Sequence, residues 1–356
     1  MIYGSVCSGI EAATMAWHKL GWKPAFFSEI EKVPRQILKH HYPNVPLHGD
    51  FTTITEHDYE KIDVLVGGTP CQSFSIAGLR EGLNCPRGNL MLEFGRLAQR
   101  LQPKYIVWEN VPGVLSSNGG RDFRAFLATM GQCGYGFAYR ILDAQYVRTQ
   151  WHPRAVPQRR RRVFVVGGIG RDWKRAAAIL FDYESMSGNP PPRRGTGEKA
   201  AKCLTRGVGT RYDFETEDFV VSLAGNTIGR QPLNGGNGNG FDESGACYAL
   251  TSADRHGVAM ACNANTSVSQ GLSTSDMPPT LCCTKTPAFY RDISVRRLTP
   301  LECLRLQGFD DDFLNVPGIS DSGWYKAIGN SMAVNCMEWI GQRIEMVEEV
   351  FSQFED

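Results

Sequence analysis

A cysteine follows a proline in the stretch GGTPCQSFS, residues 67–75, directly after a short apolar run. The apolar run at 62–66 predicts a buried strand, which the Gly-Gly-Thr-Pro sequence ends. In open α/β sheets, ligands bind at the carboxyl ends of the strands. Cys71 is therefore a candidate nucleophile on a loop. The alternative is a structural cysteine, which would more often lie inside the apolar run.

A second candidate for chemistry is the carboxylate in VWENVPG, residues 107–113. Glu109 follows another apolar strand and precedes a Pro-Gly break, so we expect it at the same sheet edge as Cys71. A carboxylate there can donate or accept a proton. The alternative is a helix cap or an ordinary loop carboxylate.

Four consecutive arginines, residues 159–162, lead into the strand-like run RRVFVVGG. Side chains alternate along a strand, so Arg160 and Arg162 should share one face, with Arg159 and Arg161 on the other. One pair can face a pocket while the other meets phosphates or solvent.

The N-terminal stretch SVCSGIEAA, residues 5–13, predicts a strand-to-helix turn that brings backbone N–H groups close to a ligand. It is not a GxGxxG sequence, because Gly9 is its one glycine, and this disfavours a dinucleotide site. Glu29, twenty residues later, is placed to bind ribose hydroxyls. Asp50 ends a third candidate strand and could reach an adenine amino group. Together these residues predict a nucleoside pocket, although each carboxylate alone could be a cap.

The elements that must position these residues alternate between strands and helices over the first 170 residues. Such alternation predicts a mixed, mostly parallel sheet with helices on both faces. A Pro/Gly-rich loop near 187–196 begins a segment rich in Gly, Asn, Ser and Thr up to about 290. Helical character returns at 299–309 and in a last helix from about 331 to 351.

Composition indicates the general class of protein but does not identify its function. The chain has 356 residues, 42% of them hydrophobic and 21% charged, which is ordinary for a soluble protein. No run is apolar enough to span a membrane, and we expect no secretory signal. Eleven scattered cysteines favour a reduced, cytoplasmic setting and show no metal-binding spacing. The net charge is +1, but residues 140–175 form a basic band that suits a polyanion.

Several motifs, in the order of the family, resemble those of the C5-specific DNA cytosine methyltransferases. The sequence as a whole resembles a phage- or prophage-type stand-alone enzyme. The matching stretches are TPCQSFS, ENVPG, PQRRRRVF, RRLTPLECLRLQGFDDDF and AIGNSM. They cover most of residues 1–170 and 295–335. The resemblance implies a Rossmann-like, S-adenosylmethionine-dependent catalytic domain, residues 1–171 and 325–356. It implies a smaller target-recognition domain at 172–324.

By this resemblance the activity is DNA (cytosine-5)-methyltransferase, and Cys71 is the nucleophile that adds to C6 of a flipped-out cytosine. Glu109 holds the N3 edge of the base, Arg162 grips O2, and Arg160 supports the site. S-adenosylmethionine supplies the methyl group. The implied cofactor-binding residues are Cys7, Ser8, Gly9, Ile10, Glu29, Ile30, Asp50, Phe51, Pro70, Leu90, Asn330 and Ser331, and no metal is implied.

Two features depart from the family pattern. The family's first motif usually begins with Asp-Leu-Phe, whereas here it begins at Ser5, and Glu11 stands where a glycine is common. The link YVRTQWHPRAVPQ, residues 146–158, is also longer than usual, and its basic residues could contact the DNA backbone or flank the pocket.

The expected partner is double-stranded DNA, with no membrane, and the chain is expected to act as a monomer. The resemblance leaves open whether it acts alone or beside a cognate restriction endonuclease. An RNA cytosine methyltransferase is the nearest alternative, although the long insert favours DNA. A non-catalytic DNA-binding protein and a Rossmann oxidoreductase are disfavoured by the intact motif residues and by the missing GxGxxG. The unusual first motif also leaves room for another one-carbon donor.

Overall fold

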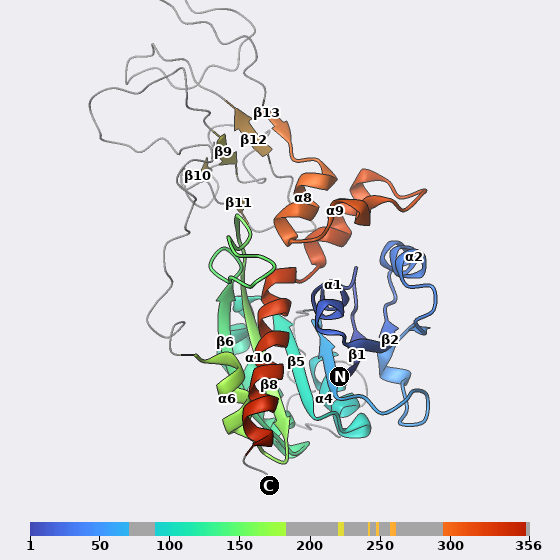
Figure 1. The fold of residues 1–356 in the computed structure, drawn as a ribbon, viewed down its shortest axis with the longest axis vertical. Coiled ribbons are helices and arrows are strands. Elements are labelled where there is room, and N and C mark those ends of the chain that lie inside the picture. Colours follow the sequence, from blue (N-terminus) through green and yellow to red (C-terminus); the bar gives the residue numbers. More distant parts are fainter. Residues whose placement is uncertain are drawn as a thin grey trace, which may run out of the picture.

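The computed structural model describes residues 1–70, 90–182 and 298–353, together with the backbone of short strands at 220–223, 241–242, 247–248, 257–260 and 295–297. Its centre is a seven-stranded sheet in the order β3-β2-β1-β4-β5-β8-β6 (Figure 1). The bounds of these strands are β1 Ile2–Val6, β2 Lys23–Ser28, β3 Leu47–His48, β4 Val64–Gly67, β5 Tyr105–Asn110, β6 Tyr135–Asp143 and β8 Arg161–Ile169.

The sheet is mixed and mostly parallel. Strands β1 to β5 run parallel, while β8 lies antiparallel between β5 and β6. The chain builds outward from β1 to β3 and then returns to the other side of β1 with β4. The strand order therefore reverses between β1 and β4, which is where open α/β sheets bind ligands at their carboxyl edge.

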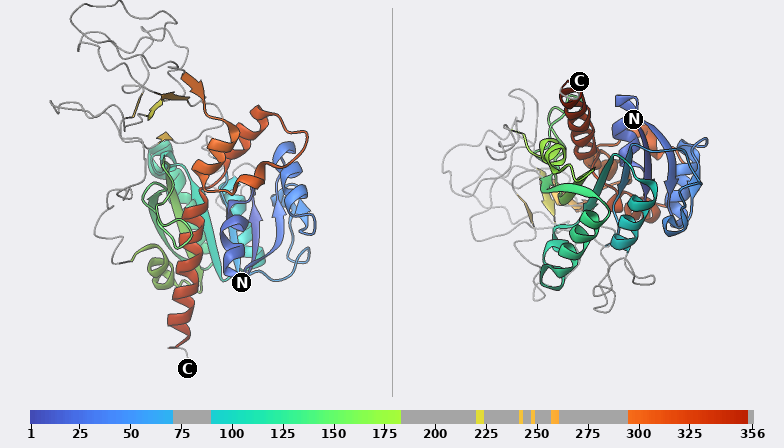
Figure 2. Two further views of the ribbon diagram at one scale, coloured as in Figure 1. Left: turned by 45° about the horizontal axis from the view of Figure 1, so that its top comes forward. Right: turned by 90° about the horizontal axis from the view of Figure 1, so that it is seen from below.

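Helices cover both faces of the sheet, as the two further views show (Figure 2). One face packs against α1 (Ala12–Trp17), α2 (Lys32–His41), α6 (Trp173–Leu180) and α10 (Val334–Ser352). The other packs against α4 (Leu90–Leu101) and α5 (Arg121–Gln132). Alternate residues of β5 serve the two cores: Val107 packs in the first and Trp108 in the second.

The C-terminal segment returns to the sheet and shares the first core. Helices α8 (Pro300–Gln307) and α9 (Asp321–Asn330) contribute Leu304 and Trp324 to it, ahead of α10. A capping box explains why α8 begins where it does, since Thr299 and Glu302 satisfy each other's backbone N–H groups. The 3₁₀ segment Asp311–Leu314 links α8 to α9.

A second, four-stranded sheet has the order β10-β9-β12-β13, and Figure 1 shows it beyond α8. Its strands are β9 Val220–Leu223, β10 Phe241–Asp242, β12 Gly257–Met260 and β13 Val295–Arg297. A further pair joins β11 (Cys247–Tyr248) to β7 (Gln158–Arg159) in parallel. The insert is thus attached directly beside the arginine run.

The predicted fold class is confirmed: a mostly parallel sheet carries helices on both faces. The sequence reading had not singled out β6 or α6. Helix α6 packs on β6 although it lies within the predicted recognition segment 172–324. No helix among the described residues is long and apolar enough to cross a membrane.

Candidate active site

A cleft opens at the carboxyl edge of the sheet, where the order of strands reverses. Residues from four segments line it: the turn after β1, the ends of β4 and β5, and the turn between α9 and α10. They are Ser5–Gly9, Glu11–Ala13, Val66, Gly68, Glu109 and 330–332. Five predicted site residues, Cys7, Ser8, Gly9, Asn330 and Ser331, thus share one cleft with predicted Glu109.

Backbone geometry makes the turn after β1 possible. Gly9 has φ +56°, a left-handed conformation that favours glycine, and no atom lies within 4 Å of where a Cβ would point. Its N–H donates to Glu29 Oε2 at 2.8 Å. The other oxygen of Glu29 accepts from the backbone N–H groups of Ile30 and Glu31, both at 2.8 Å. Glu29 therefore ties the turn after β1 to the end of β2.

Acidic groups make this side of the cleft electronegative. Burial raises the pKa of the Cys7 thiol to about 12, and the charges of Glu29 and Asp50 add to the shift. Cys7 is thus a neutral thiol and a poor nucleophile near pH 7. Asp50 is exposed and caps the 3₁₀ segment Phe51–Thr53 through Thr52 N–H. Ile30 projects an apolar side chain that is 72% exposed.

The remaining predicted cofactor residues divide between core and surface. Ile10 and Phe51 are buried in the two hydrophobic cores and do not line the cleft. Leu90 is the first residue of α4 and half-buried, whereas Pro70 is exposed and is the last described residue of its segment. Their roles as cofactor contacts stay predictions.

The end of β4 is held against β5 by side chains of β5. Asn110 Nδ2 donates to the Thr69 carbonyl at 2.9 Å, and Trp108 Nε1 donates to Thr69 Oγ1 at 3.0 Å. Gly68 permits this close packing, since a Cβ there would lie 3.2 Å from Glu109 Oε2. Cys71, the predicted nucleophile, lies outside the described residues, but its chain neighbour Pro70 emerges from this fixed point.

Glu109 and Arg162 form an ion pair, with Arg162 Nε 3.2 Å from Glu109 Oε1. The antiparallel register of β5 and β8 brings them together, because it sets Glu109 opposite Phe164 and Asn110 opposite Val163. Burial raises the pKa of Glu109, against the opposing charges of Arg162 and Arg160. A carboxyl of this kind can carry a proton closer to neutral pH than an exposed one.

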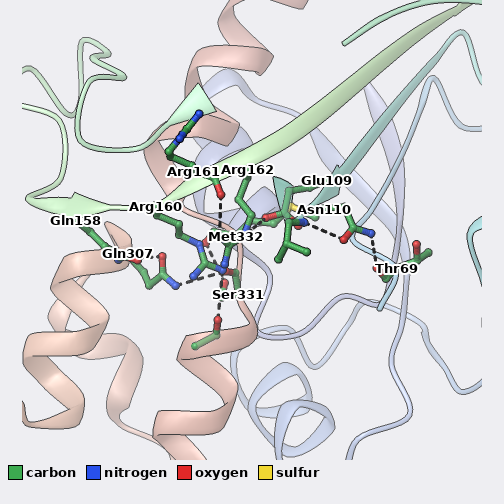
Figure 3. Close-up of polar contacts among 12 residues, drawn as sticks. Thr69, Glu109, Asn110, Gln158, Arg160, Arg161, Arg162, Gln307, Ser331 and Met332 are labelled. Atoms are coloured by element: carbon green, nitrogen blue, oxygen red, sulfur yellow. Dashed lines mark hydrogen bonds and ion pairs between the residues drawn. The ribbon is translucent and has the colours of Figure 1, made fainter. Parts of the chain in front are cut away.

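Arg160 has a different position from Arg162. Its buried guanidinium donates to the carbonyls of Ser331 at 2.5 Å and Gly329 at 3.3 Å (Figure 3). Gln307 also donates to the Ser331 carbonyl and accepts from Gln158. Arg160 therefore fixes the turn that lines the cleft, in keeping with the expected supporting role. Arg159 and Arg161 are exposed, as strand alternation predicted.

The unusually long link 146–158 is anchored to α10. The fully buried carboxylate of Glu338 accepts from Thr149 Oγ1 at 2.6 Å, contacts His152 Nδ1 at 2.6 Å and pairs with Lys19 at 3.0 Å. Asn335 Nδ2 donates to the carbonyls of Ala144 and Val147, both at 2.8 Å. The link is thus held by an ion cluster that the sequence did not reveal.

Sequence reasoning also missed the positions of Gln307, Met332 and Glu338. Gln307 and Glu338 lie on helices far along the chain, and only the folded packing brings them to the arginine run and its link. The one available signal was a polar residue on an otherwise apolar helix face. Among the described residues, no group of three or more His, Cys, Asp or Glu side chains could hold a metal ion.

Comparison with known proteins gives consistent matches over nearly the whole chain. A family model described as C-5 cytosine-specific DNA methylase matches residues 1–346. A DNA N-6-adenine-methyltransferase of Escherichia phage P1 is 34% identical over 97% of this chain, which spans 61% of that relative. The type II methyltransferase M.HpaII of Haemophilus parainfluenzae is 28% identical, with 95% of this chain and 87% of that relative covered. The solved structure of the S. pombe Dnmt2 methyltransferase has a TM-score of 0.56 at 16% identity, covering 99% of both chains.

Proposed function

The chain belongs to the family of C-5 cytosine-specific DNA methylases, and on that premise we propose that it methylates C5 of a cytosine in double-stranded DNA. The single observation that carries the proposal is the shared cleft. The turn after β1, suited to a cofactor, and Glu109, suited to a base, line the same space. A methyl donor and its acceptor must meet in such a place.

The cleft and the two carboxylates beside it fit S-adenosylmethionine, since Glu29 and Asp50 act on Cys7 in the cleft wall although neither lines the cleft. Carboxylates of Glu29 and Asp50 suit the hydroxyls and amino group of a nucleoside, and open space lies in front of Gly9. We propose that Cys7, Ser8, Gly9, Glu29 and Ile30 hold the nucleoside end. Asn330 and Ser331 would hold the amino-acid end. When bound, the cofactor supplies an electrophilic methyl group.

Cytosine C5 needs activation before it can accept that methyl. The Cys71 thiolate would add to C6, forming a carbon–sulfur bond and making C5 an enamine carbon. Glu109 would place a proton on N3 as the thiolate adds, and Arg162 would stabilise the charge that develops on O2. After methylation, loss of the C5 proton and cleavage of the carbon–sulfur bond would release the base and Cys71.

The target carbon lies inside the base stack of a duplex, so the cytosine must be flipped into the cleft. We propose that target recognition resides in the segment 172–324, in the part that follows α6. The pairing of β11 with β7 places that part next to the arginine run. The exposed arginines 159 and 161 would then contact phosphates, which position DNA without reading its sequence.

Methylation of one sequence would protect it from a cognate restriction endonuclease, which is the class of protein partner that we propose. We propose that the chain acts on DNA as a monomer.

The test is product analysis. The purified full chain is incubated with duplex DNA and methyl-labelled S-adenosylmethionine, and the DNA is digested to nucleosides. Label in 5-methylcytosine is the expected result. Label in N6-methyladenine, the product named for the phage P1 relative, or label only when RNA replaces DNA, would overturn the proposal.

A further inference from the structure

Glu11 is a buried carboxylate in the turn that lines the cleft, and its backbone is strained. It is 1% exposed and has φ 64° and ψ 57°. This left-handed conformation is unfavourable for a residue other than glycine. Such strain persists where the surrounding structure holds it, commonly at functional sites. The carboxylate in this place therefore calls for a role that a glycine could not fill.

The contacts of Glu11 join the end of β1 to the start of α1. Its Oε1 accepts from Ser5 Oγ at 2.5 Å, and its Oε2 accepts from Thr14 Oγ1 at 2.7 Å. Thr14 Oγ1 in turn lies 2.7 Å from the Tyr3 hydroxyl. Among the residues that the structure describes, the carboxylate has hydroxyl groups and the backbone of Thr14 as hydrogen-bond partners, and none is a cation. When ionised, Glu11 thus leaves a negative charge in the cleft wall without a counter-ion.

The surroundings of Glu11 bring its pKa close to neutral pH, so both the ionised and the protonated carboxyl are populated there. Burial raises the pKa of Glu11 to about 7, although hydrogen bonds from Ser5, Thr14 and Ser8 oppose the rise. The titratable groups around it are the phenols of Tyr3 and Tyr42, and the cleft also holds Cys7 and Glu109. Arg162 is paired with Glu109, and the guanidinium of Arg160 donates to the Ser331 carbonyl. A cation bound in the cleft would supply the counter-charge that ionised Glu11 lacks among these residues.

We propose that Glu11 makes the cleft prefer the sulfonium cofactor over its demethylated thioether product. This rests on the proposed function and deepens it. S-adenosylmethionine carries a positive sulfur, whereas S-adenosylhomocysteine carries a neutral one. The two otherwise present the same nucleoside and amino-acid groups. Both carry the same α-ammonium group, so the carboxylate in the wall distinguishes them only through the charge on sulfur. Transfer of the methyl therefore removes this attraction and speeds product release.

The sign of the pH effect follows from this coupling. Binding of the cation favours ionised Glu11, so below pH 7 binding releases a proton from the Glu11 carboxyl. Binding of the thioether releases none from this group. The ratio of the two affinities must therefore rise as the pH rises through about 7.

The experiment measures both ligands by titration calorimetry on the full chain between pH 5.5 and 8.5, in two buffers of different ionisation enthalpy. We expect the ratio of affinities, sulfonium over thioether, to rise about fivefold from pH 6 to pH 8, which corresponds to binding that lowers the Glu11 pKa from about 7 by one pKa unit. At pH 6 we expect proton release with the sulfonium ligand only. In Glu11→Gln the ratio should stay constant with pH.

Two further variants keep the test decisive. Glu11→Gly removes the carboxylate and relieves the left-handed backbone, so it should fold and also show a constant ratio. Glu93→Gln replaces another buried carboxylate, one on α4 paired with Arg96, and should keep the wild-type dependence. A wild-type ratio that does not change with pH would overturn the inference, as would an unchanged dependence in both Glu11 variants. Failure of both ligands to bind would instead contradict the proposed function.

Discussion

Arg162 Nε lies 3.2 Å from Glu109 Oε1, at the point where the antiparallel strand β8 meets the end of β5. The pair sets a cation beside a buried carboxyl whose pKa burial has raised. One group can stabilise negative charge while the other carries a proton. This is the combination that thiolate addition to a cytosine ring needs.

Replacing Glu109 by Gln tests whether the Glu109 carboxyl delivers a proton to N3 of the cytosine. The amide keeps the shape of the side chain but cannot move a proton to N3, so we expect turnover to fall by about 10²–10⁴-fold. Affinity for S-adenosylmethionine should change little. Asp122→Asn is the matched control, because Asp122 is also a buried carboxylate and accepts hydrogen bonds from Ser117 and Asn118 away from the cleft lining. Equal losses of turnover in both variants would refute the role of Glu109.

Replacing Arg162 by Lys tests whether the reaction needs the planar guanidinium or only its positive charge. Lysine keeps the charge but lacks the planar fork, so it cannot pair with Glu109 and a base oxygen together. We expect a loss of roughly 1.5–3 kcal/mol of transition-state stabilisation, the worth of a hydrogen bond to a charged group. Steady-state kinetics measure this loss, and Arg124→Lys, exposed on α5, should stay near the wild-type kcat/KM.

We expect Asn110 to influence the reactivity of Cys71 indirectly, because its side chain donates to the carbonyl of Thr69, two residues before Cys71. In Asn110→Ala the carbonyl loses its donor, and we expect the free energy of unfolding to fall by about 1–3 kcal/mol. Formation of the covalent adduct should slow, because the chain that carries Cys71 leaves β4 from a less fixed point. Ser116→Ala removes an exposed hydroxyl nearby and should change neither quantity. Wild-type adduct kinetics in Asn110→Ala would contradict this account.

The cluster at Glu338 predicts how stability depends on pH. Burial pushes the pKa of Glu338 upward, but hydrogen bonds from His152, Thr149 and Lys19 outweigh burial and leave it below its ordinary value. The stabilisation is therefore present above the ordinary pKa of a glutamate and is lost as the pH falls through the lowered one.

In Glu338→Gln we expect a loss of about 3–5 kcal/mol at pH 7, because Lys19 loses its counter-charge while Thr149 and His152 lose a charged partner. Urea unfolding at pH 7 and at pH 3 to 4 measures it, and the difference between variant and wild type should shrink at the acid end. Glu349→Gln, exposed on the same helix, serves as the control. A constant difference across this range would show that the cluster does not stabilise through charge.

The sequence located the sheet edge but not every contact across it. Strand patterns ending at Val6, Gly67 and Asn110 sufficed to bring the turn after β1, the end of β4 and Glu109 together, because parallel strands end at one edge. The partnership of Arg162 with Glu109 could not follow from periodicity. It depends on β8 inserting antiparallel next to β5, which no local pattern specifies.

The role of Glu11 was likewise hidden in the sequence. It stood out as a departure from the family's usual glycine, but its hydrogen bond to Ser5 and its left-handed backbone appear only in the folded turn. Glu338 and Gln307 were missed for a related reason. Each reaches a segment more than a hundred residues away in the chain, so local patterns carry no information about the contact.

The most direct test of the central claim traps the covalent step. Duplex DNA containing 5-fluorocytosine in many sequence contexts is incubated with the full chain and S-adenosylmethionine, because a fluorine at C5 cannot leave as a proton does. We predict a denaturation-resistant protein–DNA complex whose cross-linked peptide maps to Cys71, absent in Cys71→Ser although that variant still binds DNA. A complex mapped to another residue, or none on any DNA while the cofactor is demonstrably bound, would contradict the account.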